Sequence, residues 1–265
     1  MAIDRTKENI DDCFSLTVNP NCPVGHSAQF SLIAYDGAFS DTFSFALDVG
    51  TFDYLVWNPD LTPSSGQAIH NTLTSLGYVG KYLISLPYNL QLVRFHSIFA
   101  CFGVYPSNYF SNGWAPDIIN LTEYINNGGR VYVEGGDVWC NDANAAGPDF
   151  GPLFGLIGNE VGTNNLGPVI GQDNIFTAGM YFTYTGTNNS MDHMIPTTGT
   201  IIFKDQNDDY VCGVANIAAG YRTVGVSFEM GSLNNGSGVS TKAVLLDSIM
   251  PVSYTHLTLP TIYSV

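Results

Sequence analysis

The fold is decided by the segment Asn126-Asn127-Gly128-Gly129-Arg130-Val131-Tyr132-Val133-Glu134-Gly135-Gly136-Asp137. Apolar residues at helical spacing precede it, and an Asn and Gly cluster of this kind is a typical helix end. The next residues are largely apolar and run into a pair of glycines, which predicts a buried strand that ends in a tight turn. A helix followed at once by such a strand is the repeating unit of a parallel sheet covered by helices.

The same alternation of strand and helix extends upstream. Three further buried strands are predicted, at residues 53–60, 82–86 and 97–104. A helix separates the first two, with Ser64 or Ser65 as its cap and Gly77 at its end. Two strand–helix–strand units in succession predict an α/β fold with a doubly wound, mostly parallel sheet over residues 52–250.

The N-terminal part has a different period. Apolar residues alternate with polar ones in three runs, at residues 14–18, 30–34 and 43–49, and turn residues separate them. This pattern predicts three antiparallel strands within residues 1–50. Three strands leave one apolar face uncovered, so we interpret this part as a partial immunoglobulin-like β-sandwich, a short remnant ahead of the α/β domain.

The C-terminal part is rich in Gly and Asn and contains several short apolar runs. Two of these runs are predicted to pair across the turn at residues 205–209, and residues 239–250 are predicted to form a closing helix. Residues 252–265 resemble the translation of a transposase adapter used in DNA library preparation, and they are excluded from the fold. We therefore expect this chain to be a fragment of a longer protein, with neighbouring domains as partners.

Charge limits the classes of partner. The chain has 8 basic and 23 acidic residues, a formal charge of −15, which argues against binding to nucleic acid or to an anionic membrane surface. The sequence has no apolar run of the roughly 20 residues that a membrane span needs. It also has no G-x-G-x-x-G, P-loop or G-x-S-x-G motif, so we expect no cofactor, no nucleotide site and no serine-hydrolase elbow.

The segment 126–137 resembles the helix, Asn-Gly-Gly, strand and glycine turn of class I glutamine amidotransferase-like domains, including the trehalose-utilisation-protein-like branch. The strand at 53–60, the helix that ends near Gly77 and the strand at 221–224 fit the same layout, so the resemblance covers about residues 52–250. It implies a flavodoxin-like fold. Residues 21–25 and 41–45 resemble β-sandwich modules of large secreted bacterial proteins, often beside gingipain-like peptidase domains, which implies an extracellular or cell-surface location.

The amidotransferase resemblance implies a nucleophilic Cys at a sharp elbow after a central strand. At the matching turn this chain has Glu134-Gly135-Gly136-Asp137, and the late His-x-Glu pair is also missing. The resemblance therefore implies a catalytically silent relative. We predict a non-catalytic binding or accessory module, with a carbohydrate or a peptide as its ligand.

Two alternatives stay open. The first is a cysteine-dependent hydrolase or peptidase that uses Cys140 or Cys101 with His193. The second is a calcium-dependent adhesive module whose ligands are Asp205, Asn207 and Asp209, although Tyr210 stands where an EF-hand-like loop needs Gly.

The five cysteines have no metal-ligand spacing, and Cys13 and Cys22 flank one turn and could form a disulfide in an oxidising compartment.

Ligands of open parallel sheets bind beyond the carboxyl ends of the strands, at the point where the strand order reverses. In this chain that position gathers aromatic rings, carboxylates, amides and glycines. The predicted ligand-binding residues are Asn58, Asp60, Gly103, Tyr105, Gly136, Asp137 and Trp139.

Overall fold

The computed structural model describes residues 17–60, 62, 64–87, 92–142, 147–207 and 210–253, with only the backbone for 251–253. The chain divides into two compact units, Met1–Gly50 and Thr51–Val265. Each unit is considered by itself below.

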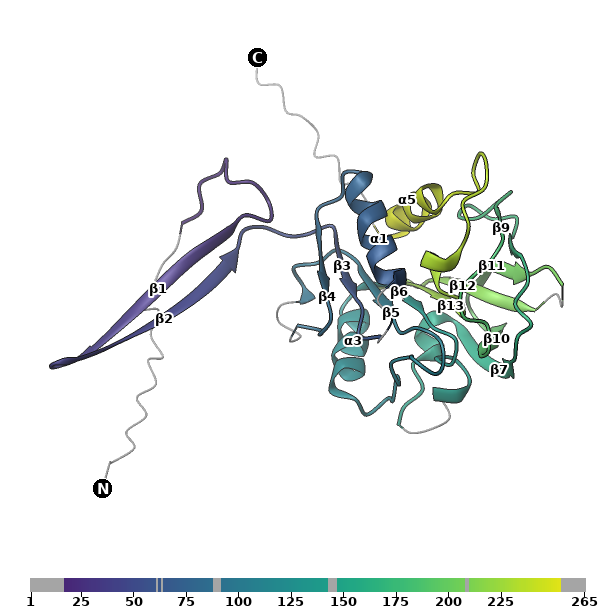
Figure 1. Ribbon diagram of the computed structural model, residues 1–265, viewed down its shortest axis with the longest axis horizontal. Helices are drawn as coiled ribbons and strands as arrows, with labels where there is room; N and C mark the ends of the chain where they lie inside the picture. The colour runs from purple at the N-terminus through teal and green to yellow at the C-terminus, as the bar shows by residue number, and fades with distance from the viewer. Residues whose placement is uncertain are drawn as a thin grey trace, which may run out of the picture. The chain divides into compact units, whose positions relative to one another are not determined.

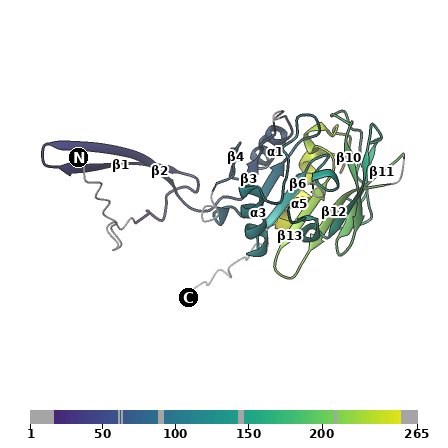
Figure 2. The same cartoon turned by 90° about the horizontal axis from the view of Figure 1, so that it is seen from below.

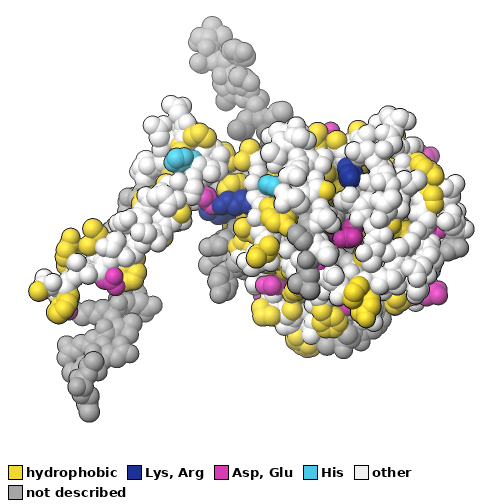
Figure 3. All heavy atoms as spheres, viewed as in Figure 1, with side chains coloured by type: hydrophobic (Ala, Val, Ile, Leu, Met, Phe, Trp, Pro, Cys, Tyr) yellow, Lys and Arg dark blue, Asp and Glu magenta, His cyan; other side chains and the backbone are white. Residues whose placement is uncertain are grey.

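The first unit contains one long hairpin. Strands β1 (Ser27–Asp36) and β2 (Phe39–Asp48) pair antiparallel along their whole length. The register places Phe30 opposite Phe45 and Leu32 opposite Phe43, so the apolar residues of both strands share one face. Most of these side chains are exposed, as the yellow side chains along the hairpin in Figure 3 show.

The predicted third strand of this unit falls mainly on residues 14–16, which lie outside the described residues. Thr17 and Val18 are described and belong to no strand. In a β-sandwich, a second sheet would cover the exposed apolar face of this hairpin. The immunoglobulin-like module itself stays a prediction.

The second unit is built on one sheet of 11 strands, in the order β4-β3-β5-β6-β13-β12-β11-β8-β9, with β10 paired to β12 and β7 (Figure 1). Its parallel half contains β3 (Tyr54–Trp57), β4 (Gly80–Leu83), β5 (Ile98–Cys101), β6 (Arg130–Glu134) and β13 (Arg222–Val226). The predicted strands at 53–60, 97–104 and 130–137 are confirmed in type, although each is shorter than predicted.

The antiparallel half follows β6 in the chain. Its strands are β7 (Leu156–Gly162), β8 (Val169–Gly171), β9 (Tyr181–Phe182), β10 (Met191–Pro196), β11 (Thr200–Asp205) and β12 (Val211–Ile217). The predicted pairing of two strands across residues 205–209 is confirmed, because β11 and β12 are antiparallel neighbours.

The α/β class is therefore confirmed, but the sheet is mixed rather than mostly parallel. The reason is local: short strands joined by Gly- and Asn-rich turns can only return beside their neighbours as antiparallel pairs. One of the short apolar runs of the C-terminal part, at residues 153–157, begins as the 3₁₀ helix η1 (Gly151–Phe154). Strands β8 and β10 were missed by the apolar pattern.

Helices pack on both faces of the parallel half, as the two views in Figures 1 and 2 show. Side chains alternate along β3, so Tyr54 and Val56 join the buried cluster that contains α1 (Ser64–Ser75) and α5 (Lys242–Ser253). Leu55 and Trp57 join the opposite cluster with α3 (Pro116–Asn126). None of the helices in the described part of the chain combines the length and apolar character that a membrane crossing requires.

We expect the two units to differ in local stability. The β1–β2 hairpin has paired backbone groups but almost no buried side chains, whereas β5 is fully buried. Amide hydrogens of buried strands exchange only when the whole domain unfolds, whereas those of an exposed hairpin exchange after local opening. Hydrogen–deuterium exchange should therefore be fast in residues 27–48 and slow in β5 and β6. Equal protection of β1 and β5 would contradict this account of the hairpin.

Candidate functional site

The parallel strands end together along one edge of the sheet, called here the carboxyl edge. Cys101 ends β5 and is the register partner of Glu134, which ends β6, and Glu134 is in turn the partner of Val226, which ends β13. The chain continues from β13 through Ser227 and Phe228 to Glu229. The carboxyl edge therefore brings a thiol and two glutamates into one neighbourhood.

Glu134 lies at the centre of the carboxyl edge and has no exposed surface. Its Oε2 atom accepts a hydrogen bond from the Tyr132 hydroxyl at 2.9 Å and another from the backbone N–H of Met230 at 2.8 Å. Ser65 and Cys101 approach the same carboxyl group and favour its charged form, although Oε1 has no well-formed hydrogen bond. Burial outweighs these contacts and raises the pKa of Glu134 above its ordinary value.

Two more acids, Glu229 and Asp60, lie at the carboxyl edge. The pKa of Glu229 is raised to about 7. Burial is the largest cause, and the negative charges of Glu134 and Asp60 add to it. Asp60 is also buried, and it accepts hydrogen bonds from the backbone N–H of Thr62 at 2.8 Å and from the Thr62 hydroxyl. Three acids in a desolvated corner favour the protonated form of at least one of them.

Gly103 is required by this arrangement. Its φ is +76°, and a β-carbon built there would lie 2.5 Å from Cγ of Asp60. A side chain would therefore displace the carboxylate that the loop packs against. The structure thus brings together three predicted residues at the carboxyl edge, Asn58, Asp60 and Gly103, where Asn58 accepts a hydrogen bond from the N–H of Gly66 at 3.1 Å.

Cys101 belongs to the same buried corner. Burial raises the pKa of its thiol well above the ordinary value, and the charge of Glu134 adds to the shift. The thiolate is the reactive form of cysteine, and catalytic cysteines are found where positive groups lower the pKa. Cys101 has the opposite environment, which suits a packed side chain.

Cys140 lies on a separate turn after β6. The Asp192 side chain holds this turn, because its Oδ2 atom accepts the N–H groups of Trp139 at 2.7 Å and of Cys140 at 2.8 Å. Burial raises the pKa of the Cys140 thiol, and the charges of Asp192, Asp137 and Glu160 raise it further. A partly buried thiol among acids is poorly suited to act as a nucleophile.

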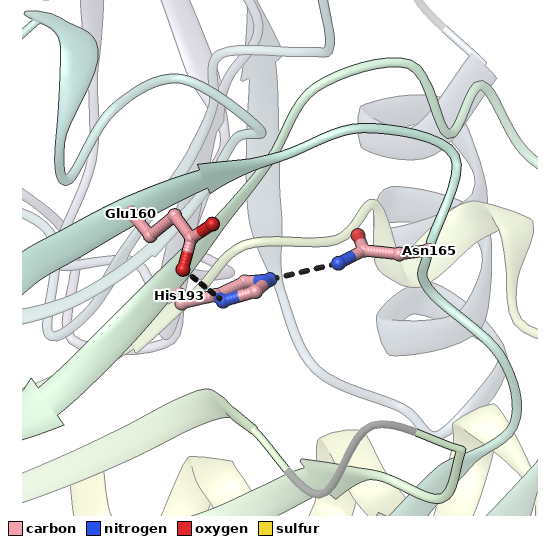
Figure 4. Close-up of polar contacts among 3 residues, drawn as sticks. All are labelled: Glu160, Asn165 and His193. Atoms are coloured by element: carbon pink, nitrogen blue, oxygen red, sulfur yellow. Dashed lines mark hydrogen bonds and ion pairs between the residues drawn. The ribbon is translucent and has the colours of Figure 1, made fainter.

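His193 follows Asp192 in β10, so the two side chains project to opposite faces of the strand. Figure 4 shows the contacts of the imidazole: Nδ1 lies 3.7 Å from Oε2 of Glu160, and Nε2 lies 3.0 Å from Nδ2 of Asn165. The ring also stacks on Tyr210, with 3.7 Å between the ring centroids. The structure therefore directs His193 away from the Asp192 side chain that holds the Cys140 turn.

The other predicted ligand-binding residues are mostly inside the fold. A β-carbon at Gly136 would lie 2.1 Å from the backbone oxygen of Ser190, and the Asp137 carboxylate accepts a hydrogen bond from the Ser190 hydroxyl. The structure places Trp139 in the hydrophobic core, where its indole N–H donates to the backbone oxygen of Val226 at 3.0 Å. Tyr105 alone among these residues is well exposed, at 57%.

Tyr105 begins an exposed group of aromatic residues in the segment 102–115, called here the aromatic loop. Phe110 is 47% exposed and Trp114 is 66% exposed. The loop is held in place at its middle, because the N–H and the hydroxyl of Ser111 donate to the buried Asp142 at 2.8 and 3.0 Å. Rings fixed at the surface in this way are a preformed contact area for a ligand.

Glu229, Phe110 and Trp114 were absent from the prediction. Glu229 could have been found, because pairing β13 beside β6 places the end of both strands at one edge. The two aromatic residues carried no signal, since exposure within a loop has no periodic pattern.

The proposed calcium ligands are only partly described, since Asp209 lies outside the described residues. Asp205 is buried, and its Oδ1 atom accepts the N–H of Gly167 at 2.5 Å. Asn207 also packs on Gly167. Within the described ranges, no group of three or more His, Cys, Asp or Glu side chains is arranged to hold a metal ion.

The predicted disulfide concerns the first unit. Cys22 is unbridged in the structure, and its predicted partner, Cys13, lies outside the described residues.

No protein-family model and no curated protein matches this sequence. Solved structures do match. A protein from Thermoplasma acidophilum that is named for GMP synthase is 11% identical, with a TM-score of 0.51 over 77% of this chain and 95% of its own. A ThuA-like protein from Bacteroides uniformis is 11% identical, with a TM-score of 0.50 over 77% of this chain and 92% of its own.

A β-galactosidase from Bacillus circulans sp. alkalophilus is 10% identical, with a TM-score of 0.51 over 76% of this chain and 30% of its own. The chain spans only 28% to 31% of the length of the β-galactosidases that it matches. At these identities the likeness concerns the fold alone. The amidotransferase-like and ThuA-like fold is thus confirmed, while the gingipain association stays a prediction.

The turn held by Asp192 gives a test through pH. Burial raises the pKa of Asp192 to about 8, so the folded chain keeps a proton that the unfolded chain loses near pH 4. The stability from this proton is fully present below pH 4 and is lost as the pH rises to about 8. Urea unfolding should show the free energy of unfolding falling across this window, at up to about 1.4 kcal/mol per pH unit.

Asp192→Asn should flatten this slope, because an amide keeps an acceptor for the N–H groups but does not titrate. Asp173→Asn, at an exposed acid, is the matched control and should leave the slope unchanged. An unchanged slope in Asp192→Asn would rule out the buried, protonated state of this carboxyl group.

Proposed function

We propose that the α/β unit is a non-catalytic binding module of a secreted or cell-surface bacterial protein, and that it binds carbohydrate through the aromatic loop. One observation carries the proposal: the corner where a working amidotransferase needs its nucleophile is filled by the buried carboxyl group of Glu134. Residues 1–50 would belong to an immunoglobulin-like sandwich of the longer protein, and the parallel half of the sheet would represent a flavodoxin-like core.

The environment of the thiols supports the non-catalytic part. Both Cys101 and Cys140 have a raised pKa, and acids surround them. His193 is engaged by Glu160 and Asn165. The thiolate is the nucleophile of a thiol hydrolase, so the raised pKa values of the two thiols disfavour the cysteine-hydrolase alternative.

The aromatic loop supports the choice of carbohydrate. Trp and Tyr offer an apolar face against which a sugar ring can pack, together with a polar atom that stays hydrated. Tyr105 and Trp114 are the most exposed rings of the loop, and side-chain amides of Asn108 and Asn112 lie between them in the sequence. Similar folds also form part of the β-galactosidases, which are named for a sugar substrate.

The protein should be applied to a glycan array, and the affinity of the best ligand should be measured by calorimetry. Trp114→Ala is expected to weaken binding about tenfold or more, because the ring supplies most of the stacking area. Tyr181→Ala removes a ring that is 44% exposed on β9, and this matched control should bind like the wild type.

The same samples should be incubated with glutamine, ester and peptide substrates, and no turnover is expected. Turnover that is lost in Cys140→Ala or Cys101→Ala would overturn the non-catalytic assignment. Binding of peptides but of no glycan would overturn the choice of carbohydrate as the ligand. Glycan binding that Trp114→Ala leaves intact would overturn the choice of the aromatic loop as the surface.

A further inference from the structure

The opposite edge of the parallel strands, where they begin, has a different charge. Six of the 8 Lys and Arg residues lie in the described part of the chain, because Arg5 and Lys7 fall in residues 1–16. Four of these six lie near the start of a parallel strand: Arg130 and Arg222 are the first residues of β6 and β13, Lys81 is the second residue of β4, and Arg94 precedes β5 by a few residues. This amino edge is therefore a basic region on a protein with a net charge of −15.

The basic residues of the amino edge are connected through packed rings. Phe52 and Phe95 stack with their centroids 5.3 Å apart. The Lys81 ammonium lies 5.0 Å from the centre of the Phe52 ring, and the Arg94 guanidinium lies 5.8 Å from it. Arg222 and Arg130 are register partners in neighbouring strands. The charges of Lys81 and Arg94 are thus held against the Phe52 ring.

A groove of about 260 Å³ opens at this edge, lined by Val93, Phe95, His96, Tyr124, Asn127, Gly128, Gly129 and Arg130. Its base is fixed, because the Tyr124 hydroxyl donates to the backbone oxygen of Phe95 at 2.8 Å. Arg130 and Tyr124 both line the groove. The groove therefore combines an aromatic and aliphatic wall with a guanidinium and an imidazole.

The acids Glu123 and Asp53 lie in segments next to the groove in the described part of the chain. Glu123 lies on α3 next to Tyr124 and is exposed, and Asp53 precedes β3, where its Oδ2 atom accepts the N–H of Val79 at 2.8 Å. Neither acid lines the groove. Among the residues that line the groove, Arg130 is the one that carries a permanent charge.

We propose that this groove binds a small organic carboxylate with an apolar or ring-shaped body. The two oxygens of a carboxylate match the planar donors of Arg130, and the body packs on Phe95 and Tyr124. The volume of about 260 Å³ lies just below the usual range of small-molecule pockets, roughly 300–1,000 Å³, which suits a small ligand. A polyanion needs a longer basic track, and an inorganic oxyanion would leave the apolar wall unused.

Sodium benzoate is a suitable probe because it has this shape, and benzamide is its uncharged counterpart. Titration of the isotope-labelled full chain, followed by NMR at low ionic strength, should shift the amide signals of residues 93–96 and 124–130. Benzoate should bind about tenfold or more tightly than benzamide, and the affinity should fall as sodium chloride is added. This measurement uses the wild-type chain and does not depend on the stability of a variant.

Arg130→Gln should weaken benzoate binding about tenfold or more. Lys204→Gln removes a charge from β11, outside the amino edge, and should bind like the wild type. The proposal is overturned if benzoate and benzamide bind equally, if sulfate binds as tightly as benzoate, if the shifts lie elsewhere, or if a folded Arg130→Gln variant keeps full affinity. These outcomes are independent of carbohydrate binding at the aromatic loop.

Discussion

The buried carboxyl group of Glu134 joins the elements that meet at the carboxyl edge. It ends β6, accepts hydrogen bonds from Tyr132 and from the backbone of Met230, and faces Ser65 and Cys101. One side chain thus connects β5, β6, the segment after β13 and the first turn of α1. A charge or a hydrogen-bonded acid in such a place is costly to bury, so its partners must be positioned accurately.

Because Glu134 fills the carboxyl edge, we propose binding at other parts of the surface. The carboxyl edge is where open parallel sheets usually hold ligands, but here acids, glycines and backbone groups fill it. What projects outward is the aromatic loop, which Asp142 holds through Ser111. At the other end of the same strands, Arg130 lines a small groove. The sheet therefore presents an acidic, closed edge and a basic, open edge.

Sequence patterns were sufficient for the parallel half of the sheet. Its strands are short apolar runs bounded by clear turn and cap residues, and a parallel strand buried on both faces has few other ways to satisfy its backbone. They were insufficient for the antiparallel half, where β8 has three residues and β10 contains Asp, His and Pro. Such strands form because neighbouring strands pair with them, not because their own residues favour a strand. The mixed sheet could therefore not be derived from the period of apolar residues alone.

The site shows the same division. The Glu-Gly-Gly-Asp turn after β6 was visible in the sequence, and Asp60 does pack against Gly103, while ligand binding by Asn58, Asp60 and Gly103 stays a prediction. Burial could not be predicted in the same way: Trp139 lies in the core and Trp114 lies at the surface, although both follow a strand of the parallel half.

Equilibrium unfolding of Glu134→Ala tests the central claim most directly, with Glu123→Ala, at an exposed glutamate on α3, as its control. We expect Glu134→Ala to lose about 3 kcal/mol or more, because buried donors are left unpaired, and Glu123→Ala to stay within about 1 kcal/mol of the wild type. Equal stability of the two variants would contradict the structural role of Glu134.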